Sequence, residues 1–193
     1  MNKYLTSSAI IDWDNPKVMT KAKDLAQGVD SSLEIAKKCF IYVRDEIQHS
    51  NDYQLNPVTC KASDVLEHKT GFCYAKSHLL AALLRANGIP AGLCYQRLAV
   101  ENDKPPFCLH GLNAVYLPDF GWYRIDARGN KEGVFTEFIP PVEKLAFQIV
   151  NEGEADFQEI WSDPLPEIKK VLESSNSFQE VADNLPDIEI IKS

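Results

Sequence analysis

The sequence predicts a domain of the α+β class, because helices fill its first half and strands that can pair antiparallel follow. The clearest helix carries four leucines at three- and four-residue spacing between residues 79 and 84, and Gly88 ends it. Apolar and polar residues then alternate over 91–100, and two more strands are expected at 110–117 and 122–127. Strands that follow helices, instead of alternating with them, favour α+β over a parallel α/β sheet.

Two helices precede the leucine-rich helix in the chain. Asn15 and Pro16 start the first, which Gly28 ends, and Ser31 and Ser32 start the second. The second helix repeats apolar residues on one face, namely Leu33, Ala36, Phe40, Val43 and Ile47. We expect this pair of helices to cover one side of the core.

Turn-forming residues mark the connections between these elements. Residues 50–58 should form a loop that leads into a short helix at 62–66. The polar residues 101–106, which include two prolines, should separate the first strand from the second. Residues 118–121 should form a hairpin turn between the second strand and the third.

A single domain is expected to span residues 1–193, with a core at about 31–130. Residues 1–30 should form an N-terminal helical segment. Residues 134–193 should form a C-terminal extension packed on the core, irregular except for a helix that Pro166 starts. With 193 residues, of which 45% are hydrophobic, the chain can bury a full core.

Composition excludes several functional classes. The net charge of -8 provides no basic field for phosphate backbones, so we expect no nucleic-acid partner. No apolar run approaches the roughly 20 residues of a membrane span, and no signal-peptide pattern opens the chain. We therefore expect a cytoplasmic protein without a membrane partner, whose five cysteines are reduced thiols.

Cys73 occupies the first turn of the leucine-rich helix, where a thiol can become a nucleophile. The first turn exposes unpaired N–H groups and the positive end of the helix dipole, and both favour a thiolate over a thiol. A free cysteine ionises with a pKa of about 8.5, so this help or a nearby imidazole is needed at neutral pH. Gly71 has no side chain and should leave the approach to the sulfur open. The alternative is that Cys73, on the same helix face as Leu80 and Leu84, only fills the core.

Among the four histidines, His110 is the best candidate for the base. His49 ends a helix, His68 precedes a glycine turn, and His78 lies across the helix from the leucines and should be exposed. His110 instead starts a strand. The next strand carries Asp126 inside an otherwise apolar run, where a carboxylate needs a partner.

The hairpin register decides whether His110 and Asp126 can meet. A three-residue loop at 118–120 pairs Asp126 with Leu112, which makes Asp126 a diagonal neighbour of His110 on the same face. A four-residue loop would pair Asp126 with Asn113 and turn the two side chains to opposite faces. Contact between His110 and Asp126 therefore requires the odd loop or a bulge.

A histidine and an aspartate placed in this way can complete a catalytic thiol. His110 would accept the Cys73 proton and later protonate the leaving group, while Asp126 would fix the tautomer of the imidazole. Proton transfer of this kind is worth about 10²- to 10⁴-fold in rate. The alternatives are that His110 only begins a strand and that Asp126 pairs with Arg124 or Arg128.

Three stretches of the chain resemble the core motifs of the transglutaminase-like superfamily, in the family's order of cysteine, histidine and aspartate. They are TGFCYAKSHLLAALLRANGIPAG from Thr70, LHGLNAVYL from Leu109 and GWYRIDARG from Gly121, within residues 60–130. The resemblance extends to bacterial members, among them candidate cysteine proteases. It implies a papain-like fold in which a central helix, with the nucleophile at its N-terminus, packs on an antiparallel sheet.

Carried over to the matching positions, the resemblance makes Cys73 the nucleophile, His110 the general base and acid, and Asp126 the orienting carboxylate. It implies no metal, no cofactor, and a protein or peptide substrate with a glutamine or another amide group. Two departures bear on substrate preference. Residues 112–114 read Leu-Asn-Ala, where many members have an aromatic and then an acidic residue, and Ala127 follows Asp126 in place of proline.

Acyl transfer also needs an oxyanion hole, and the backbone N–H of Cys73 is one expected donor. Gln54, Tyr53 and His68 are the candidates for the second donor. Trp122, beside the hairpin turn, can line a substrate groove or be a buried aromatic of the sheet.

The leading hypothesis is a Cys-His-Asp thiol enzyme that acts on amide or peptide bonds through a thioester, as a peptidase, an amidase or a transglutaminase-type acyltransferase. One alternative is a non-catalytic member of the same fold that binds a peptide or a protein. Another is a zinc site of Cys94, Cys108 and His110. The segment 108–110 is too short for the usual spacing of paired zinc ligands, and no CxxC occurs.

Overall fold

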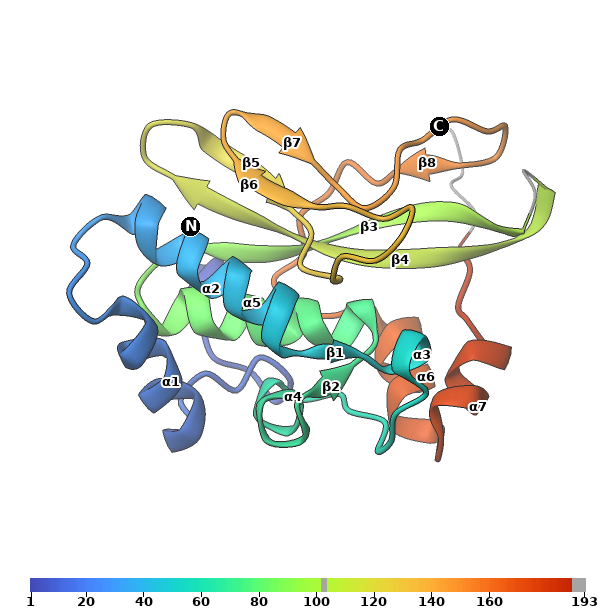
Figure 1. Ribbon diagram of the computed structural model, residues 1–193, viewed down its shortest axis with the longest axis horizontal. Coiled ribbons are helices and arrows are strands. Elements are labelled where there is room, and N and C mark those ends of the chain that lie inside the picture. Colours follow the sequence, from blue (N-terminus) through green and yellow to red (C-terminus); the bar gives the residue numbers. More distant parts are fainter. Residues whose placement is uncertain (102–103, 189–193) are drawn as a thin grey trace.

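The fold is built around one central helix, α5 (Cys73–Ala86), which lies between other helices and a sheet (Figure 1). A computed structural model describes residues 1–101 and 104–188. Three helices pack on α5 at the positions predicted from the sequence, and they are α1 (Pro16–Ala26), α2 (Ser32–Glu46) and α4 (Ala62–His68). The sheet covers the other side of α5.

Because α5 lies at the centre of the fold, every residue from Cys73 to Arg85 is buried. This part of the helix therefore has no face exposed to solvent. The prediction that His78 is exposed is therefore wrong. One ring nitrogen of His78, Nδ1, lies 2.8 Å from the Cys60 carbonyl oxygen, and burial lowers the pKa of His78 to about 4. Arg85 is also buried, and its Nε donates to the Ala91 carbonyl oxygen. Backbone carbonyls outside α5 thus accept hydrogen bonds from Arg85 and face the Nδ1 of His78, whereas the Nε2 of His78 is buried without a partner among the described residues.

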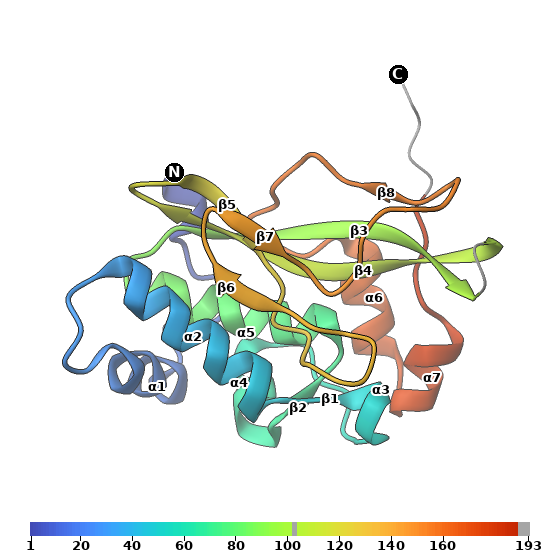
Figure 2. The same ribbon diagram turned by 45° about the horizontal axis from the view of Figure 1, so that its top comes forward.

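The sheet has four antiparallel strands in the order β5-β4-β3-β8, and their bounds are β3 (Ala91–Glu101), β4 (Lys104–Leu117), β5 (Gly121–Ile125) and β8 (Ala155–Asp156). β3 and β4 form a long hairpin whose far end projects beyond the helices (Figure 2). The predicted loop at 101–106 is wrong for the described residues, because β3 extends to Glu101 and β4 begins at Lys104, and residues 102–103 lie outside the described part. Pro105 and Pro106 are tolerated there because this end of β4 pairs only with β3.

The turn between β4 and β5 has the three-residue loop that contact between His110 and Asp126 requires. Leu117 pairs with Gly121 and Asn113 pairs with Ile125, so residues 118–120 form the loop. Continuing this register by one residue sets Asp126 opposite Leu112, on the same side of the sheet as His110.

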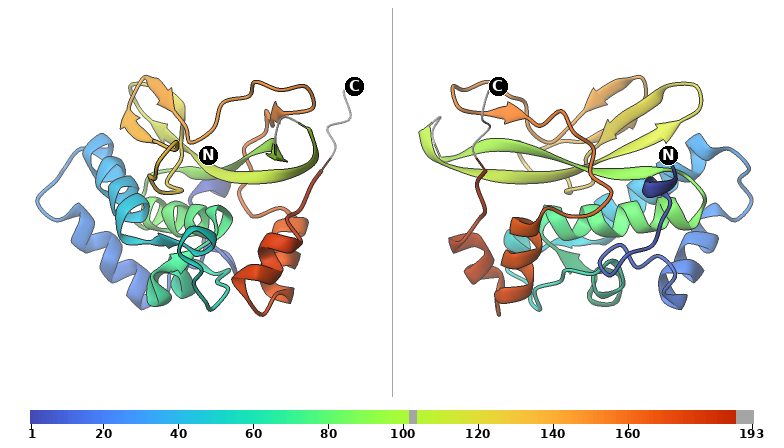
Figure 3. Two further views of the ribbon diagram at one scale, coloured as in Figure 1. Left: turned by 45° about the vertical axis from the view of Figure 1, so that its right-hand side comes forward. Right: turned by 180° about the vertical axis from the view of Figure 1, so that it is seen from behind.

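The C-terminal extension contains more regular structure than its sequence pattern predicts. Besides β8 it forms β6 (Glu137–Ile139), β7 (Val142–Lys144), α6 (Pro166–Ser174) and α7 (Phe178–Asp183). β8 pairs with the edge of β3 within the sheet, and the β6–β7 hairpin lies next to β5 (Figure 2). The helices α6 and α7 lie together on the helical side (Figure 3). Ile168, Leu172 and Val181 are buried in the same hydrophobic cluster as α5.

Four short elements complete the described chain, and they are η1 (Asn2–Tyr4), β1 (Gln48–His49), α3 (Ser50–Tyr53) and β2 (Thr70–Gly71). The helix α3 falls within the segment that was expected to be a loop. β1 and β2 pair in parallel, with His49 opposite Gly71. Within residues 1–101 and 104–188, none of the helices has the length and apolar character that crossing a bilayer requires.

Candidate active site

Cys73 is the first residue of α5, directly after Phe72, which occupies the N-cap position. The side chain is largely buried but lines a cavity of about 560 Å³, so the sulfur adjoins space that a ligand can enter. Because Cys73 lies in the first turn, its backbone N–H has no partner within the helix. The sulfur and this donor therefore lie together at the positive end of the helix dipole.

Gly71 serves packing rather than access to the sulfur, contrary to the expectation from the sequence. A Cβ atom at this position would lie 3.1 Å from both the Ala75 Cβ and the Thr59 Oγ1. The Thr59 hydroxyl in turn donates to the Thr70 carbonyl oxygen at 2.9 Å. Because Gly71 has no side chain, β2 can lie against the first turn of α5. This close contact fixes the backbone that leads into Cys73.

A second glycine brings β4 against the start of α5. A Cβ atom at Gly111 would lie 2.9 Å from the Tyr74 Cδ1 and 3.1 Å from its Cα, so only glycine fits this close approach. The Tyr74 hydroxyl also donates to the Leu109 carbonyl oxygen. These two contacts lie on either side of His110 in the sequence, and they hold the strand that carries His110 against the turn that carries Cys73.

His110 and Asp126 form a buried, hydrogen-bonded pair. The His110 Nε2 lies 2.7 Å from the Asp126 Oδ2, and the two residues are 4% and 1% exposed. The carboxylate also accepts two backbone hydrogen bonds, from Arg128 N at 3.0 Å and from Ala146 N at 3.1 Å. The buried charge is thus fully supplied with donors, as a carboxylate in this environment requires.

The alternative partners of Asp126 are engaged elsewhere. The Arg124 guanidinium binds Glu143 and Asp156, and the Arg128 guanidinium binds both oxygens of Asp52 at 2.7 and 3.0 Å. Only the backbone of Arg128 contacts the Asp126 carboxylate.

The electrostatic environment favours a charged imidazole at His110. Burial alone would lower its pKa, but the charges of Asp126 and Cys73, together with hydrogen bonds to both, raise the pKa of His110 to about 10. Burial likewise opposes ionisation of Asp126, yet His110 and the two backbone donors hold the pKa of that carboxyl below its ordinary value. Since Nε2 binds Asp126, Nδ1 is the nitrogen left for the sulfur of Cys73.

The C-terminal extension covers the ring of His110. Phe147 meets it edge-on, with ring centroids 5.0 Å apart, and the neighbouring Ala146 supplies one of the donors to Asp126. The pair is therefore shielded by residues that lie outside the three motifs.

His49 is a residue of this site that reasoning from sequence placed only at a helix end. The two-residue ladder of β1 with β2 sets it opposite Gly71, and its ring meets Phe72 edge-on at 5.5 Å. His49 lines the same cavity as Cys73, and its Nδ1 is buried without a hydrogen-bond partner, 3.7 Å from the Asp52 Oδ2. Burial, with the charge of Arg128, lowers its pKa well below the ordinary value, so the imidazole is neutral. A strand of two residues leaves no periodic signal that could have predicted this placement.

Lys76, one turn after Cys73, is a buried lysine that holds the end of α2. Its Nζ donates to the Ile47 carbonyl oxygen and, at 3.4 Å, to that of Arg44. A cation at a helix C-terminus is favourable. Burial, together with the charge of Arg128, lowers the pKa of Lys76 to about 7. Lys76 thus supports the turn from α2 into β1, which carries His49.

The four residues predicted as further donors or groove residues do not line the cavity that contains Cys73, so far as the described part of the chain shows. Tyr53 is 58% exposed and borders a neighbouring cavity of about 310 Å³. Gln54, which ends α3 in the left-handed conformation, and His68, the last residue of α4, are both exposed.

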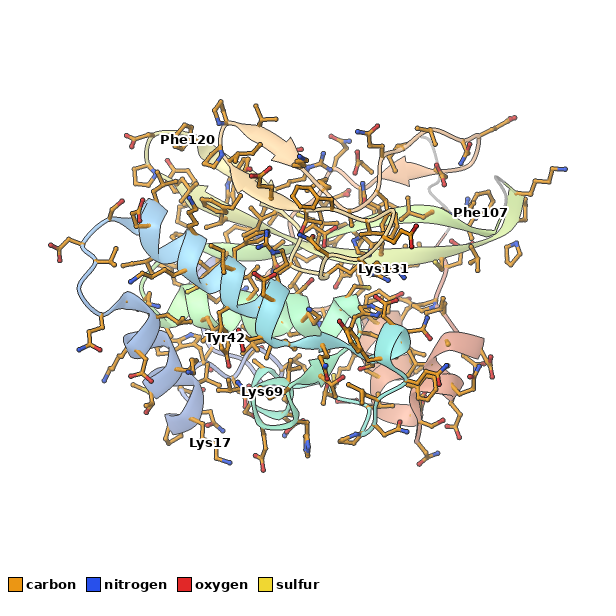
Figure 4. All side chains as sticks on the ribbon, viewed as in Figure 1. Lys17, Tyr42, Lys69, Phe107, Phe120 and Lys131 are labelled. Atoms are coloured by element: carbon orange, nitrogen blue, oxygen red, sulfur yellow. The ribbon has the colours of Figure 1, made fainter. Side chains whose placement is uncertain are left out.

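Trp122, on β5, is not among the described residues that border this cavity. Its ring packs edge-on against Tyr4 and Tyr116. Trp122 is therefore a packed aromatic of the sheet, which was the second of the two interpretations. Trp122 follows the β4–β5 turn, where Phe120 is labelled, at the end of the sheet opposite to Phe107 (Figure 4).

Residues 1–101 and 104–188 contain no ligand set for the zinc site considered above. In this part of the chain, no three histidine, cysteine or acidic side chains are close enough to hold an ion. Cys94 packs among Leu112 and Ala114 in a small apolar cluster. Burial raises the pKa of Cys94 and of Cys108 to about 12, as expected for packed thiols.

Comparison with solved structures identifies several similar folds. A candidate cysteine protease from Cytophaga hutchinsonii matches with a TM-score of 0.51 and 21% identity over 65% of this chain and 40% of that protein. The periplasmic domain of TgpA from Pseudomonas aeruginosa matches with a TM-score of 0.48 and 18% identity, over 64% and 45% of the two chains. Red sea bream transglutaminase matches with a TM-score of 0.45 and 11% identity, over 61% and 27%. The chain thus spans less than half the length of each of these proteins.

The comparison with family models gives the most direct relationship. No curated protein matches the chain. The family model of the transglutaminase-like superfamily matches residues 20–127, which are more than half of the chain and include Cys73, His110 and Asp126. The likeness to the Cytophaga protein supports the same fold. The chain therefore belongs to the transglutaminase-like superfamily.

Proposed function

We propose that the chain is a thiol enzyme that acts on amide or peptide bonds through a thioester on Cys73. His110 is the general base and acid, and Asp126 orients it. The observation that carries this proposal is the buried 2.7 Å hydrogen bond between His110 and Asp126, beside a cysteine that opens a helix. The substrate is a protein or peptide with a glutamine side chain or another amide group.

The reaction proceeds in two acyl transfers. The Cys73 sulfur attacks the carbonyl carbon of the amide, the C–N bond breaks, and the proton on His110 goes to the departing amine. Water or a primary amine then gives a proton to His110 and attacks the thioester, which releases a carboxylic acid or a new amide and returns the sulfur to its starting state. Asp126 keeps the Nδ1 of His110 directed at the sulfur through both steps.

The oxyanion that forms on the carbonyl carbon needs two donors. The backbone N–H of Cys73 is one, and we propose His49 as the second in place of Gln54, Tyr53 and His68. His49 lines the same cavity as Cys73, and Nε2 is the ring nitrogen that does not face Asp52. Its low pKa keeps the imidazole neutral, with one N–H available to donate.

The proposal is tested by trapping the thioester. The protein is mixed with a nitrophenyl ester of N-acetylglycine, quenched in acid and digested, and the acyl group is located by mass spectrometry. The acyl group is expected on Cys73, and Cys73→Ala should lose turnover at least about 10⁴-fold. Cys108→Ala is the matched control, because Cys108 lines the same cavity and should be dispensable.

Two outcomes would contradict an enzymatic role. One is the absence of an acyl adduct although iodoacetamide modifies Cys73. The other is peptide binding of equal affinity in the wild type and in Cys73→Ala without turnover, which would make the chain a binding module. Adding a primary amine separates the two possible reactions, because only an acyltransferase forms the new amide in competition with water.

A further inference from the structure

The cavity that contains Cys73 has a largely apolar part, which Gln148 and Glu154 also border. Six residues from three separate segments form it, and they are Leu98, Ala99, Val100, Phe147, Val150 and Leu185. These six residues are called the apolar wall below, and Cys73, His110 and His49 are called the reactive wall. The apolar wall takes no part in the chemistry described above.

Two valines of the apolar wall are exposed to solvent. Val100 is 43% exposed and Val150 is 74% exposed. Single exposed apolar side chains are common on protein surfaces. Here two of them, from segments far apart in the sequence, line the same cavity as the reactive thiol. A ligand that covers them removes apolar surface from water and is favoured for that reason.

Glu154 fixes Val150 relative to the end of β3. One carboxylate oxygen accepts a hydrogen bond from Ala99 N at 3.1 Å, and the other accepts from Val150 N at 3.1 Å and Asn151 N at 3.0 Å. Burial opposes ionisation of Glu154, but these backbone donors hold its pKa below the ordinary value. The carboxylate thus connects the two exposed parts of the apolar wall through backbone donors of both.

The segment that follows α7 contributes Leu185 and is also held in place. The Pro186 carbonyl oxygen accepts a hydrogen bond from Leu109 N at 2.8 Å, one residue before His110. The Asp187 carboxylate binds the Arg97 guanidinium through two bonds of 2.6 Å. This segment passes alongside β3 and β4 (Figure 3). The apolar wall is therefore built before a ligand arrives, which lowers the entropic cost of binding.

We propose that the apolar wall binds a large apolar side chain of the substrate, of leucine or phenylalanine type, next to the amide bond that Cys73 attacks. The inference rests on the proposed function, since it names the kind of peptide that the same site selects. A cavity of about 560 Å³ holds such a side chain with its flanking backbone. Burying one large apolar side chain is worth roughly one to two powers of ten in affinity.

The test uses a pair of peptide reagents that modify Cys73 without turnover. Acetyl-Leu-Gly chloromethyl ketone and acetyl-Asn-Gly chloromethyl ketone differ in one side chain of similar shape but opposite polarity. Rates of Cys73 modification are read by peptide mass spectrometry, which also detects Cys108, and are divided by the rate with iodoacetamide. The leucine reagent is expected to react at least tenfold faster than the asparagine reagent in the wild type.

Matched variants locate this preference on the apolar wall. Val150→Asp should reduce the preference to less than twofold, and dividing each peptide rate by the iodoacetamide rate removes any effect of the added charge on the reactivity of Cys73. Val142→Asp adds the same charge at a valine that is 59% exposed on β7 and outside the cavity, and it should keep the wild-type preference. Glu154→Gln should weaken the preference in the same direction as Val150→Asp, because Glu154 is a positioning residue.

Equal rates of the two peptide reagents in the wild type would overturn the inference. So would a Val142→Asp variant that loses the preference as fully as Val150→Asp does. A strong preference for the leucine reagent, in a protein that never forms a thioester, would overturn the proposed function alone and leave the apolar wall as a peptide-binding site.

Discussion

The reactive wall and the apolar wall border one cavity, yet they are stabilised in different ways. His110 and Asp126 are almost fully buried and joined by a 2.7 Å hydrogen bond, with two backbone donors behind them. The apolar wall depends on the partly exposed carboxylates of Glu154 and Asp187, which tie separate segments together. Substitutions on the reactive wall should therefore change the rate of acyl transfer, whereas substitutions on the apolar wall should change which peptide is chosen.

The largest effect on turnover is expected from Asp126→Asn, which changes the hydrogen-bond partner of His110. The neutral amide of asparagine cannot stabilise the imidazolium form of His110. It also has a single oxygen, whereas the Asp126 carboxylate accepts from Arg128 N with one oxygen and from Ala146 N with the other. We expect turnover to fall by about 10²- to 10⁴-fold. The rate of thioester formation, measured alongside the thermal unfolding midpoint, checks this. A folded variant within threefold of the wild-type rate would remove Asp126 from the mechanism.

His49→Ala should have the next largest effect. Loss of one oxyanion donor typically lowers kcat by about 10²- to 10³-fold. The rate of Cys73 alkylation by iodoacetamide should stay near the wild-type value, since that reaction forms no tetrahedral oxyanion. Tyr53→Phe is the control, because Tyr53 lies outside the cavity. Parallel losses of turnover and alkylation would instead show that His49 only shapes the turn before Cys73.

Lys76 holds the end of α2, which leads into the strand that carries His49. The contribution of Lys76 to stability should depend on pH. The pKa of Lys76 falls from 10.5 to about 7 on folding. Between these values the unfolded chain binds one more proton than the folded chain at this site, so its contribution to stability rises with pH. The difference in unfolding free energy between the wild type and Lys76→Met should therefore grow in favour of the wild type from pH 7 to pH 10. Urea unfolding at both pH values measures it, and a constant difference would contradict the buried placement.

The smallest effect is expected on the apolar wall, from Asp187→Asn. Loss of a partly exposed ion pair should cost at most about 1 kcal/mol of stability. The preference for the leucine reagent should fall about two- to threefold as Leu185 becomes less fixed, with turnover of small esters unchanged. Asp183→Asn removes the same charge at an exposed site in α7 and should change neither quantity. A tenfold loss of ester turnover in Asp187→Asn would break the division between the two walls.

The reactive wall could be predicted from sequence where local rules decide the structure. A leucine repeat that stops at Gly88 fixed the helix, and the position of Cys73 at its start followed. The register of Asp126 stayed open between a three-residue and a four-residue loop, and the pairing of Leu117 with Gly121 decides for the one that brings Asp126 to the side of His110. His49 could not be found this way, because a two-residue strand has no period and its position comes from pairing with β2.

The apolar wall could not be predicted, because its parts come from segments without a repeating pattern. Phe147, Val150 and Leu185 lie outside regular elements. Their segments are held by hydrogen bonds between residues distant in the sequence, such as Ala99 N to Glu154 and Leu109 N to the Pro186 carbonyl oxygen. Pro105 and Pro106 predicted a break where β4 in fact continues, since strand pairing on one side only tolerates them. The exposure predicted for His78 was wrong for a related reason: the periodicity of a helix does not reveal that neighbours cover all of its faces.

Activation of Cys73 by His110 is tested by the rate of Cys73 alkylation by iodoacetamide against pH, in the wild type and in His110→Ala. We expect Cys73 in the wild type to react quickly below pH 7, because the imidazolium of His110 favours the thiolate. His110→Ala should lose this advantage, while Cys39 and Cys60 react slowly in both proteins. If Cys73 reacts no faster than Cys39 or Cys60, or as fast without His110 as with it, His110 does not activate a nucleophile at Cys73.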